Sequence, residues 1–529
     1  MPATVSDEDL VAALTRPEAY PWRPPPVEVI ETHISWVFLA GERVVKVKRP
    51  VRLGFVDHST IERRRHSCEE EVRLNRRLTD DVYLGAVPIA SERGRLTVDG
   101  PGDPVEWATL MRRLPAEGML DRLLGAGSAP ADLAVRLARR LVPFHREFAA
   151  DCGCESYGTP QALASVLTDN LDELRPFAGR RLATVQLALV DEAIRSFLVA
   201  NADLLAQRVV DGWVRDGHGD LRAEHVCLEG DETQVFDCVE FNPAIRCADI
   251  ASDLAFLLMD LDRLGAGDDG RALEDRYRDA GIPLPPSLLR LYRAHRALVR
   301  AKVDCLTLAS AHVAHPGLSG EARAYLNLAT RAALTVRPFL VVMTGLSGTG
   351  KSTVAHALVE ATGAVVHSSD RVRKDLARAT GETAADWGAG IYTQDWTDLT
   401  YRRLHEQAAA ELTAGRPVIL DATYLETSRR DDAAAIGVRA GVPVLLVETV
   451  CDEGAVAARL AARAARHDSP SDATLDAYRR QREASCRPPP GVPAGAIAIA
   501  VDTTDQGPGL LDPVFAALAA AGAIETRVP

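Results

Sequence analysis

The sequence has no long uninterrupted apolar run and no excess of positive charge. No stretch is apolar enough to span a bilayer, and the first ten residues (MPATVSDEDL) are acidic where a secretory signal would be basic and then apolar. There are 61 Lys and Arg against 74 Asp and Glu, which gives a formal net charge of -13. This balance disfavours generic binding to nucleic acid or to anionic membranes. We therefore expect a cytoplasmic protein.

Cysteine is also scarce. The chain has nine, an odd number in 529 residues, which does not fit a disulfide framework. Cys152 and Cys154 form a C-x-C pair that could supply half of a zinc site, but no second pair with suitable spacing follows. The favoured interpretation is reduced thiols in packed or loop positions.

The chain also lacks internal repeats and low-complexity tracts, and its 47% apolar and 26% charged residues are typical of folded protein. A length of 529 residues predicts more than one domain. Periodicity and turn residues divide the chain at about residues 115 and 335. Residues 1–115 mix short strands with a charged helix, residues 116–335 are mostly helical, and residues 336–529 alternate helices with strands.

The third section opens with the apolar strand FLVVMTG and continues with the strands GAVVHSS, PVILDAT and PVLLVET, each separated from the next by a helical segment. Such alternation predicts βαβ units, and therefore a doubly wound parallel sheet with helices on both faces.

The segment GLSGTGKS, from Gly345 to Ser352, is a full G-x-x-x-x-G-K-[ST] motif between a strand and a helix. Its backbone N–H groups and the helix N-terminus would cradle phosphate oxygens. Lys351 would bridge the terminal phosphates, and the Ser352 hydroxyl would bind Mg²⁺. The expected ATP-binding residues are Gly345, Ser347, Gly348, Thr349, Gly350, Lys351, Ser352 and Thr353.

Two aspartates follow strands of this section and should lie at the carboxyl edge of the sheet, where open α/β folds bind ligands. Asp421 ends the strand PVIL and is a candidate metal ligand, whereas Asp370 follows AVVHSS and is a candidate base for an acceptor hydroxyl. Arg373 could bind an anionic acceptor. Further on, Arg459, Arg463 and Arg466 share one helical face, which is either solvated or part of a lid over the nucleotide.

These residues make the third section resemble the small-molecule P-loop kinases, the group of gluconate kinase, zeta toxins and polynucleotide 5'-hydroxyl kinases. The match covers GLSGTGKST, SSDRVRK, VILDATY and RLAARAARHDSPSDA. The resemblance implies that Lys351 and Asp370 are catalytic, that Arg373 contacts an acceptor phosphate or the transition state, and that Arg463 is a lid arginine. The acceptor would be read by residues 377–404.

A second candidate site comes from HGDLRAEHV (218–226) and VFDCVEFN (235–242). The two segments place one aspartate in a loop and another at the end of a strand. Carboxylates so placed can divide the work of phosphoryl transfer. Asp220 is the candidate base and Asp237 the candidate metal ligand.

This combination resembles the aminoglycoside phosphotransferases, which have a two-lobed protein-kinase-like fold. The resemblance spans about residues 30–300 and implies an N-lobe over residues 1–115 and a helical C-lobe over residues 116–335. It further implies that Lys46 or Lys48 binds the α/β phosphates and that Glu71 pairs with that lysine. The choice between the two lysines is open.

The sequence departs from this family at one position, because His225 stands where the family has a metal-binding Asn. An imidazole can ligate a divalent ion but suits Zn²⁺, Cu or Fe better than Mg²⁺. Glu240 or Asn242 could supply an oxygen ligand instead. The departure makes a non-catalytic, nucleotide-binding half a credible alternative.

The overall prediction is a fusion of two ATP- and Mg²⁺-dependent kinases that act on hydroxyl groups of small molecules, such as sugars, sugar acids, nucleosides or aminoglycoside-like compounds. Alternatives are a regulatory pseudokinase in the N-terminal half and a nucleic-acid 5'-hydroxyl kinase in the C-terminal half. The acidic net charge disfavours the second alternative.

Overall fold

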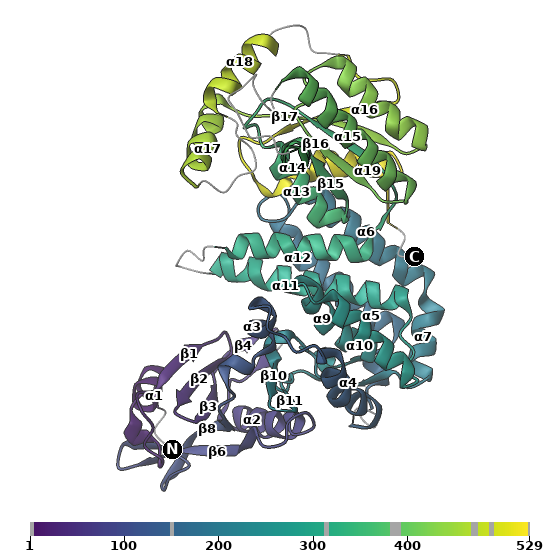
Figure 1. Ribbon diagram of the computed structural model, residues 1–529. Coiled ribbons are helices and arrows are strands. Elements are labelled where there is room, and N and C mark those ends of the chain that lie inside the picture. The colour runs from purple at the N-terminus through teal and green to yellow at the C-terminus, as the bar shows by residue number, and fades with distance from the viewer. Residues whose placement is uncertain are drawn as a thin grey trace. The chain divides into compact units, whose positions relative to one another are not determined.

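The computed structural model describes residues 5–54, 56–148, 153–310, 317–380, 393–466, 474–485 and 491–526. The chain forms two compact units (Figure 1), one of residues 1–165 with 201–293 and the other of residues 166–200 with 294–529. Helices of the expected middle section are shared between these units. The domain boundaries predicted at residues 115 and 335 therefore stay predictions.

An antiparallel sheet of six strands, in the order β1-β2-β3-β8-β6-β7, begins the first unit. The strands of this part are β1 (Glu28–Glu31), β2 (Ser35–Ala40), β3 (Arg43–Lys48), β6 (Tyr83–Glu92), β7 (Arg95–Val98) and β8 (Asp103–Arg112), and a separate pair is formed by β4 (Arg52–Leu53) and β5 (Val56–Asp57). Strands β2 and β3 pair across the turn at Gly41, in agreement with the short strands predicted for residues 1–115.

The two faces of β3 have different neighbours because side chains alternate along a strand. Val45 and Val47 lie in a core cluster with residues of helix α1 (Asp7–Leu14). Lys46 and Lys48 therefore share the opposite face. Lys46 is paired in register with Thr109 of β8.

Helix α2 (Ile61–Asn75) corresponds to the predicted charged helix, and the Thr60 hydroxyl caps its N-terminus by accepting the Arg63 N–H. Cys68, Glu71 and Asn75 recur at helical spacing and are buried on the side of α2 that packs on β6 and β8. A carboxylate is thereby carried to the face of the sheet where the two lysines lie.

The rest of the first unit is mostly helical, and helix α9 is its central element because every residue from Ile250 to Leu261 is buried. Short antiparallel pairs β9–β12 and β10–β11 flank the candidate catalytic loop. The elements are α3 (Leu120–Gly125), α4 (Leu133–Pro143), α7 (Ala202–Val210), β9 (Val214–Asp216), β10 (Val226–Glu229), β11 (Glu232–Val235), α8 (Pro243–Arg246), β12 (Cys247–Asp249), α9 (Ile250–Arg263) and α10 (Gly267–Asp279), and α5 (Pro160–Leu174) and α11 (Pro286–Ser310) each contribute residues to both units.

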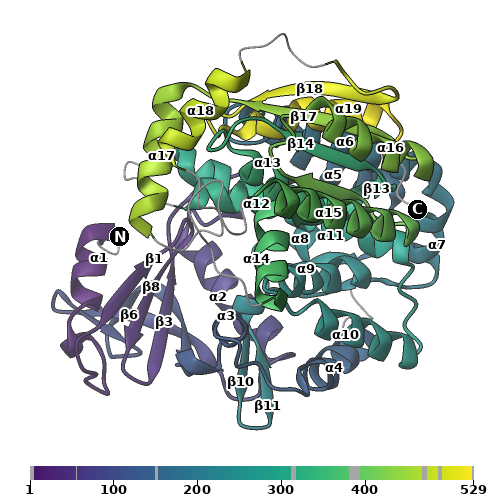
Figure 2. The ribbon, with the colours of Figure 1, turned by 45° about the horizontal axis from the view of Figure 1, so that its top comes forward.

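The second unit contains a five-stranded sheet, all of whose neighbouring strands are parallel, in the order β15-β16-β14-β17-β18. Figure 2 shows helices on both sides of it. The strands are β14 (Leu340–Thr344), β15 (Val365–Ser368), β16 (Val418–Asp421), β17 (Val444–Val450) and β18 (Ala496–Asp502), with a small pair β13 (Thr335–Val336) and β19 (Ile524–Glu525). The predicted doubly wound parallel sheet is confirmed.

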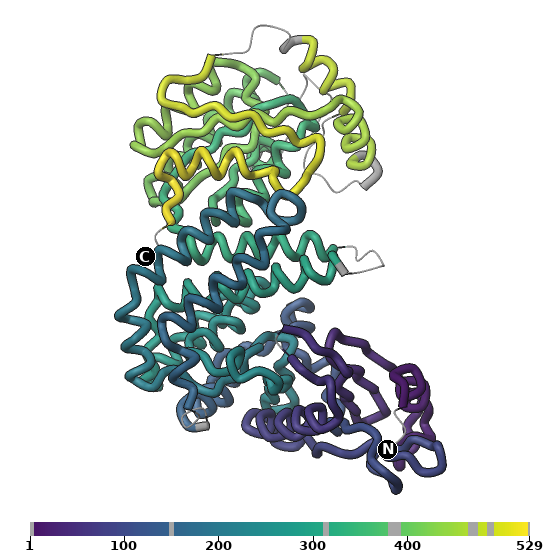
Figure 3. Tube along the Cα trace, turned by 180° about the vertical axis from the view of Figure 1, so that it is seen from behind, coloured from purple at the N-terminus to yellow at the C-terminus, as the bar shows by residue number. Residues whose placement is uncertain are grey.

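One face of this sheet, including Leu340, Val342 and Leu420, packs on α15 and α16. Helix α19 packs on β17 and β18 and also on α6 (Figure 3). The Asp512 carboxylate, at the start of α19, accepts the N–H groups of Thr184 and Val185 at the start of α6. The helices of the second unit are α6 (Thr184–Ala200), α12 (Leu318–Ala333), α13 (Lys351–Thr362), α14 (Ser369–Thr380), α15 (Gln394–Thr413), α16 (Thr427–Ala440), α17 (Glu453–Arg466), α18 (Leu475–Ser485) and α19 (Asp512–Ala520).

The cysteine prediction is only partly supported. Six described cysteines, Cys68, Cys227, Cys238, Cys247, Cys305 and Cys451, are free, whereas Cys154 is in a disulfide bond. Cys152 lies outside the described residues. Among the described helices, none combines the length and the apolar character needed to cross a membrane.

Candidate active sites

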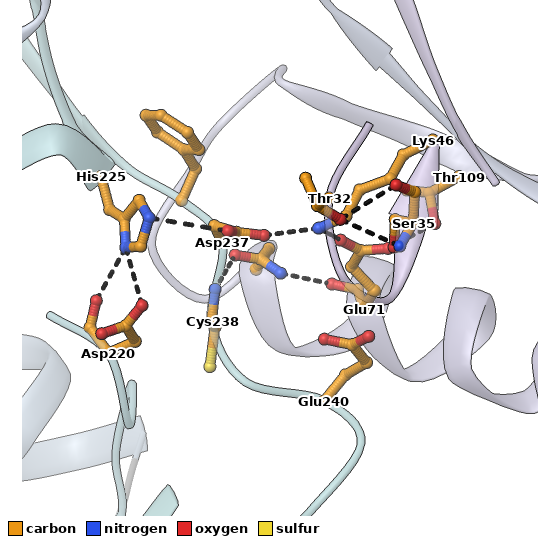
Figure 4. A network of polar contacts seen from close by, with 12 residues as sticks. Thr32, Ser35, Lys46, Glu71, Thr109, Asp220, His225, Asp237, Cys238 and Glu240 are labelled. Carbon is orange, nitrogen blue, oxygen red and sulfur yellow. Dashed lines mark hydrogen bonds and ion pairs between the residues drawn. The ribbon is translucent and has the colours of Figure 1, made fainter. Parts of the chain in front are cut away.

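Lys46 is the centre of a charge network in the first unit (Figure 4). Its Nζ donates to Glu71 Oε1 at 2.7 Å and to Asp237 Oδ1 at 2.6 Å. The second Glu71 oxygen accepts from the Thr109 hydroxyl at 2.6 Å. Burial opposes the charge of Lys46, but Asp237 and Glu71 outweigh it and raise the pKa of this ammonium well above its usual value. A strand lysine, a helix glutamate and a loop aspartate are thus joined.

Lys48 lies two residues away on the same face but has a different environment. Its Nζ is 2.9 Å from Glu71 Oε2 and 2.5 Å from Glu240 Oε1, and its side chain is fully buried. Lys46 keeps 14% of its side chain exposed. Burial raises the pKa of Glu240 in spite of Lys48. Lys46 is therefore the more exposed of the two lysines, and Lys48 holds Glu71 and Glu240 in the interior.

Asp237 follows β11 in the left-handed region of backbone space, with φ of 65°. An aspartate tolerates this conformation better than most residues. The hydroxyl of Tyr83 accepts the Asp237 N–H, and Asn75 Oδ1 accepts the N–H of Cys238. Burial disfavours the charged carboxylate, but Lys46 and His225 outweigh it, so the pKa of Asp237 lies well below its usual range. The anchored backbone keeps this carboxylate beside Lys46.

Asp220, the candidate base, is held by Arg222. The guanidinium donates from Nε to Asp220 Oδ1 at 2.9 Å and from Nη2 to Asp220 Oδ2 at 3.2 Å. Arg222 is nearly buried and lies over the ring of Phe256. Burial acts against its charge, but Asp220 and Glu224 raise the pKa of Arg222. Both Asp220 oxygens are therefore matched by a permanent cation.

The loop that carries Asp220 is fixed through its backbone. Asp253 of α9 accepts the N–H groups of His218 and Gly219 at 2.7 and 2.8 Å, and His145 Nε2 lies 3.1 Å from Asp253 Oδ2. Gly219 has φ of +86°, and a Cβ there would lie 3.2 Å from Val239 side-chain atoms. A side chain at this position would thus be strained and crowded.

His225 joins the two aspartates of this site. Its Nδ1 lies 2.8 Å from the backbone oxygen of Asp220, and its Nε2 lies 3.6 Å from Asp237 Oδ2. Figure 4 shows the ring between the two residues. The proposed oxygen donors from the neighbouring segment are engaged elsewhere: Glu240 with Lys48, and Asn242 with the N-terminus of α8.

The P-loop of the second unit lies between β14 and α13, as the motif predicts. Gly350 has φ of +91°, and a Cβ there would approach Thr503 Oγ1 to 3.0 Å. Lys351 Nζ donates to the backbone oxygens of Gly345 and Leu346 at 3.1 and 2.7 Å. Burial lowers the pKa of Lys351 to about 8, against the opposing effect of Asp421 and Asp370.

Two side-chain oxygens, of Ser352 and Asp421, meet at the edge of the parallel sheet. The Ser352 hydroxyl, at the start of α13, donates to Asp421 Oδ2 at 2.7 Å. Burial raises the pKa of Asp421, and the hydrogen bond from Ser352 and the charge of Lys351 oppose this shift. Hydroxyl and carboxylate oxygens are hard donors that suit Mg²⁺.

Asp370 and Arg373 lie in the first turns of α14, directly after β15. Arg373 Nη1 is 4.0 Å from Asp370 Oδ1, and the Asp370 side chain is 34% exposed. Asp370 is close enough to raise the pKa of Lys351. The structure thus brings Asp370, Lys351 and Asp421 together. Part of the predicted acceptor segment, residues 381–392, lies outside the described residues.

The three arginines of α17 have different environments. Arg459 donates to Cys451 Sγ, to the Thr503 hydroxyl and to the backbone oxygens of Thr503 and Thr504, so it holds the loop after β18. Arg463 is near enough to Lys351 to lower its pKa. The side chain of Arg466 lies outside the described part of the structure.

Two contact residues of these sites were missed by the sequence analysis: Arg222 and Gln481. Arg222 follows Asp220 by two positions, which is a signal that could have been used. Gln481 of α18 accepts the Ser347 N–H of the P-loop at 2.9 Å. Nothing in the local sequence of α18 indicates that contact, because it joins residues 134 positions apart.

A family model described as an AAA domain matches residues 340–489. The chain is 32% identical over 458 residues to the uncharacterized protein Rv2004c of Mycobacterium tuberculosis and to the uncharacterized protein Mb2027c of Mycobacterium bovis. Each match covers 85% of this chain and 89% of the relative.

Solved structures with similar folds fall into two groups. A gluconokinase from Sinorhizobium meliloti is 22% identical and covers 35% of this chain and 94% of its own, with a TM-score of 0.25. A choline/ethanolamine kinase family protein from Mesorhizobium loti is 14% identical and covers 61% of this chain and 94% of its own, with a TM-score of 0.39. An aminoglycoside 2'-phosphotransferase is 14% identical and covers 58% and 92%, with a TM-score of 0.36.

The AAA-domain match over residues 340–489 and the parallel strand order agree with the predicted P-loop domain. The contacts among Lys46, Glu71 and Asp237 agree with the predicted kinase-like unit before it. The predicted class, an ATP-dependent phosphotransferase, is consistent with this P-loop domain. The roles of individual side chains are a separate matter.

Proposed function

The chain belongs to the family of the mycobacterial protein Rv2004c, and we propose that it is a kinase with two separate ATP sites that phosphorylates hydroxyl groups of small molecules. The observation that carries the proposal is that each half holds a lysine and two carboxylates within one network of contacts. In the first unit these are Lys46, Asp237 and Asp220. In the second unit they are Lys351, Asp421 and Asp370.

In the P-loop site, Lys351 would leave its own backbone carbonyls and bind the β- and γ-phosphates, while the P-loop amides bind their oxygens. Ser352 and Asp421 would hold Mg²⁺, which when bound neutralises phosphate charge. Asp370 would accept the proton of the acceptor hydroxyl as its oxygen bonds to the γ-phosphorus and the bond to ADP breaks. Arg373 and Arg463 would stabilise the transferring group.

In the N-terminal site, Lys46 would bind the α/β phosphates and Glu71 would keep it oriented. Asp220 would orient the acceptor hydroxyl. Arg222, which already spans both Asp220 oxygens, would meet the developing charge of the γ-phosphoryl group. Because Asp253 holds the loop backbone, these two side chains would keep their positions during transfer.

The acceptor is proposed to be a small molecule: a sugar, a sugar acid, a nucleoside or an aminoglycoside-like compound. The acidic net charge supports this choice over a nucleic-acid end. We propose that the protein acts in the cytoplasm, where ATP and small metabolites are present.

The test is an ATP-consumption screen over these four classes of acceptor with the wild type, Lys351→Ala and Asp220→Ala. Each variant should lose about 10²-fold or more of the turnover at one site, as is usual when a transition-state contact is removed. Arg371→Ala, an exposed neighbour on α14, is the matched control. If Lys351→Ala leaves all ATP turnover intact, the C-terminal assignment is wrong.

A second candidate for the N-terminal half is nucleotide binding without transfer, and His225 is the observation that favours it. If Asp220→Ala changes no acceptor-dependent turnover while Lys46→Met removes nucleotide binding, this half is a binding module. Phosphorylation of a 5'-hydroxyl oligonucleotide at low salt would instead support a nucleic-acid acceptor for the P-loop half.

A further inference from the structure

We propose that the N-terminal site takes its nucleotide with a first-row transition-metal ion, of the Mn²⁺ to Zn²⁺ class, which His225 Nε2 and the Asp237 carboxylate ligate. The inference rests on the proposed function, because it requires a nucleotide at this site. It concerns the choice of cation and not the reaction. Its basis is the tautomer of His225, the spacing of the two ligand atoms and the small number of protein ligands.

The hydrogen bond of His225 determines which of its nitrogens carries the proton. Nδ1 lies 2.8 Å from the Asp220 backbone oxygen, which can only accept. Nδ1 is therefore the donor, and in the neutral ring the lone pair is on Nε2. Metal-binding histidines characteristically donate their other N–H to a carbonyl or carboxylate oxygen in this way.

The lone pair lies beside a carboxylate. Nε2 is 3.6 Å from Asp237 Oδ2, which is too long for a hydrogen bond. Two ligand atoms on one ion, each about 2.0–2.2 Å from it, lie roughly 3–3.5 Å apart. A movement of a few tenths of an ångström would therefore suffice for both atoms to bind one cation.

The described residues contain no group of three or more His, Cys, Asp or Glu side chains placed to hold a metal. Glu224 Oε1 lies 3.8 Å from Nε2, but Arg222 binds that oxygen, and Glu240 is paired with Lys48. Two protein ligands hold a cation only weakly, so phosphate oxygens must complete its coordination. Metal binding at this site should therefore require nucleotide.

The ligand chemistry selects the class of ion. Mg²⁺ is hard, prefers oxygen and demands nearly octahedral geometry. Imidazole nitrogen suits transition metals, for which affinity rises from Mn²⁺ to Cu²⁺ and is lower again for Zn²⁺. One nitrogen and one carboxylate together with phosphate oxygens therefore favour such an ion over Mg²⁺. The P-loop site, with Ser352 and Asp421, offers oxygen alone.

The experiment uses the full chain carrying Ser352→Ala and Asp421→Ala, so that the P-loop cation site is removed. Mn²⁺ and ADP are added, and electron paramagnetic resonance measures bound Mn²⁺, while spin-echo modulation detects a directly bound ¹⁴N. We expect bound Mn²⁺ only with ADP present, and we expect a nitrogen coupling. In His225→Asn the nitrogen coupling should vanish. The Mg²⁺ concentration that displaces Mn²⁺ should be at least about tenfold lower than in the protein that keeps His225, which is the scale on which contacts to metal ligands act.

His66→Asn, an exposed histidine of α2, is the matched control and should change neither signal. Circular dichroism and the thermal midpoint establish that His225→Asn is folded, and His225→Gln provides a second amide at the position. Bound Mn²⁺ and ADP without nitrogen coupling, or an unchanged Mg²⁺ competition in both amide variants, overturns the inference alone. Absence of ADP binding with every cation overturns the proposed N-terminal function together with it.

Discussion

The two candidate sites differ in how their charged side chains are paired. In the N-terminal site the charged groups pair with one another: Lys46 with Glu71 and Asp237, and Arg222 with Asp220. In the P-loop site, Lys351 donates to the neutral backbone oxygens of Gly345 and Leu346, and burial lowers its pKa to about 8. The first site is ordered by its side chains. In the second site, the Lys351 ammonium is bound by backbone oxygens and not, within the described part of the chain, by a carboxylate.

The largest expected difference separates the two lysines of β3. Lys48→Met should lower the free energy of unfolding by about 3–5 kcal/mol, because it leaves Glu71 and Glu240 buried without their cation. Lys46→Met should cost less stability, since Lys46 is partly exposed, and should abolish nucleotide binding at this site. Denaturant unfolding and nucleotide titration in the Lys351→Ala background measure the two effects. Equal destabilisation by both substitutions would contradict the assignment.

Arg222 provides the next test. Arg222→Met should reduce N-terminal phosphoryl transfer about 10²-fold, as expected for a lost transition-state contact, with a smaller effect on nucleotide affinity. Single-turnover transfer and nucleotide binding separate these quantities. Arg73→Met, on the exposed face of α2, serves as the control. A loss confined to affinity would mean that Arg222 only positions Asp220.

The P-loop site should respond to pH through Lys351. Its pKa of about 8 in the free protein lies below the ordinary 10.5, so a nucleotide that restores the charge must take up a proton above pH 8. Affinity should fall by up to about tenfold per pH unit above 8. In the same window, from pH 8 to 10.5, the unfolded chain holds the extra proton, so Lys351 makes folding more favourable as pH rises.

Calorimetry in buffers of different ionisation heat measures the proton uptake at the P-loop site. Lys351→Arg cannot lose its proton and should remove this pH dependence. If the uptake persists in that variant, another group carries it.

The smallest expected effect distinguishes two arginines of α17. Arg459→Ala should lower the free energy of unfolding by about 1–2 kcal/mol, because its guanidinium binds the carbonyls of Thr503 and Thr504. Arg463→Ala should leave stability nearly unchanged and reduce P-loop turnover. Thermal unfolding and ATP-dependent turnover of the pair provide the comparison, and reversed effects would make Arg459 the lid residue.

The P-loop half was predicted from the sequence more fully than the N-terminal half. GLSGTGKS carries its own geometry, because the glycines, the lysine and the helix start are neighbours in the chain, and the β16 strand does end at Asp421. The fold class and the kinase-like character of both halves were likewise predicted. The assignment of functional limits at residues 115 and 335 stays a prediction.

The sequence could not separate Lys46 from Lys48, since both follow the same alternation on one strand. Their difference arises from partners far along the chain: Asp237 lies 191 residues from Lys46, and Glu240 lies 192 residues from Lys48. Arg222 and Asp220 are close in sequence, but the strength of their ion pair depends on burial against α9, which no local pattern indicates.

By itself, the sequence predicted two phosphate-binding halves, because their motifs are short and their backbone requirements are local. The tertiary structure alone decided which of the two lysines is more exposed, which nitrogen of His225 carries the proton and which oxygens accept from Lys351. Each of those outcomes depends on burial and on distances between groups that only folding brings together. The strength of a charge interaction depends on both.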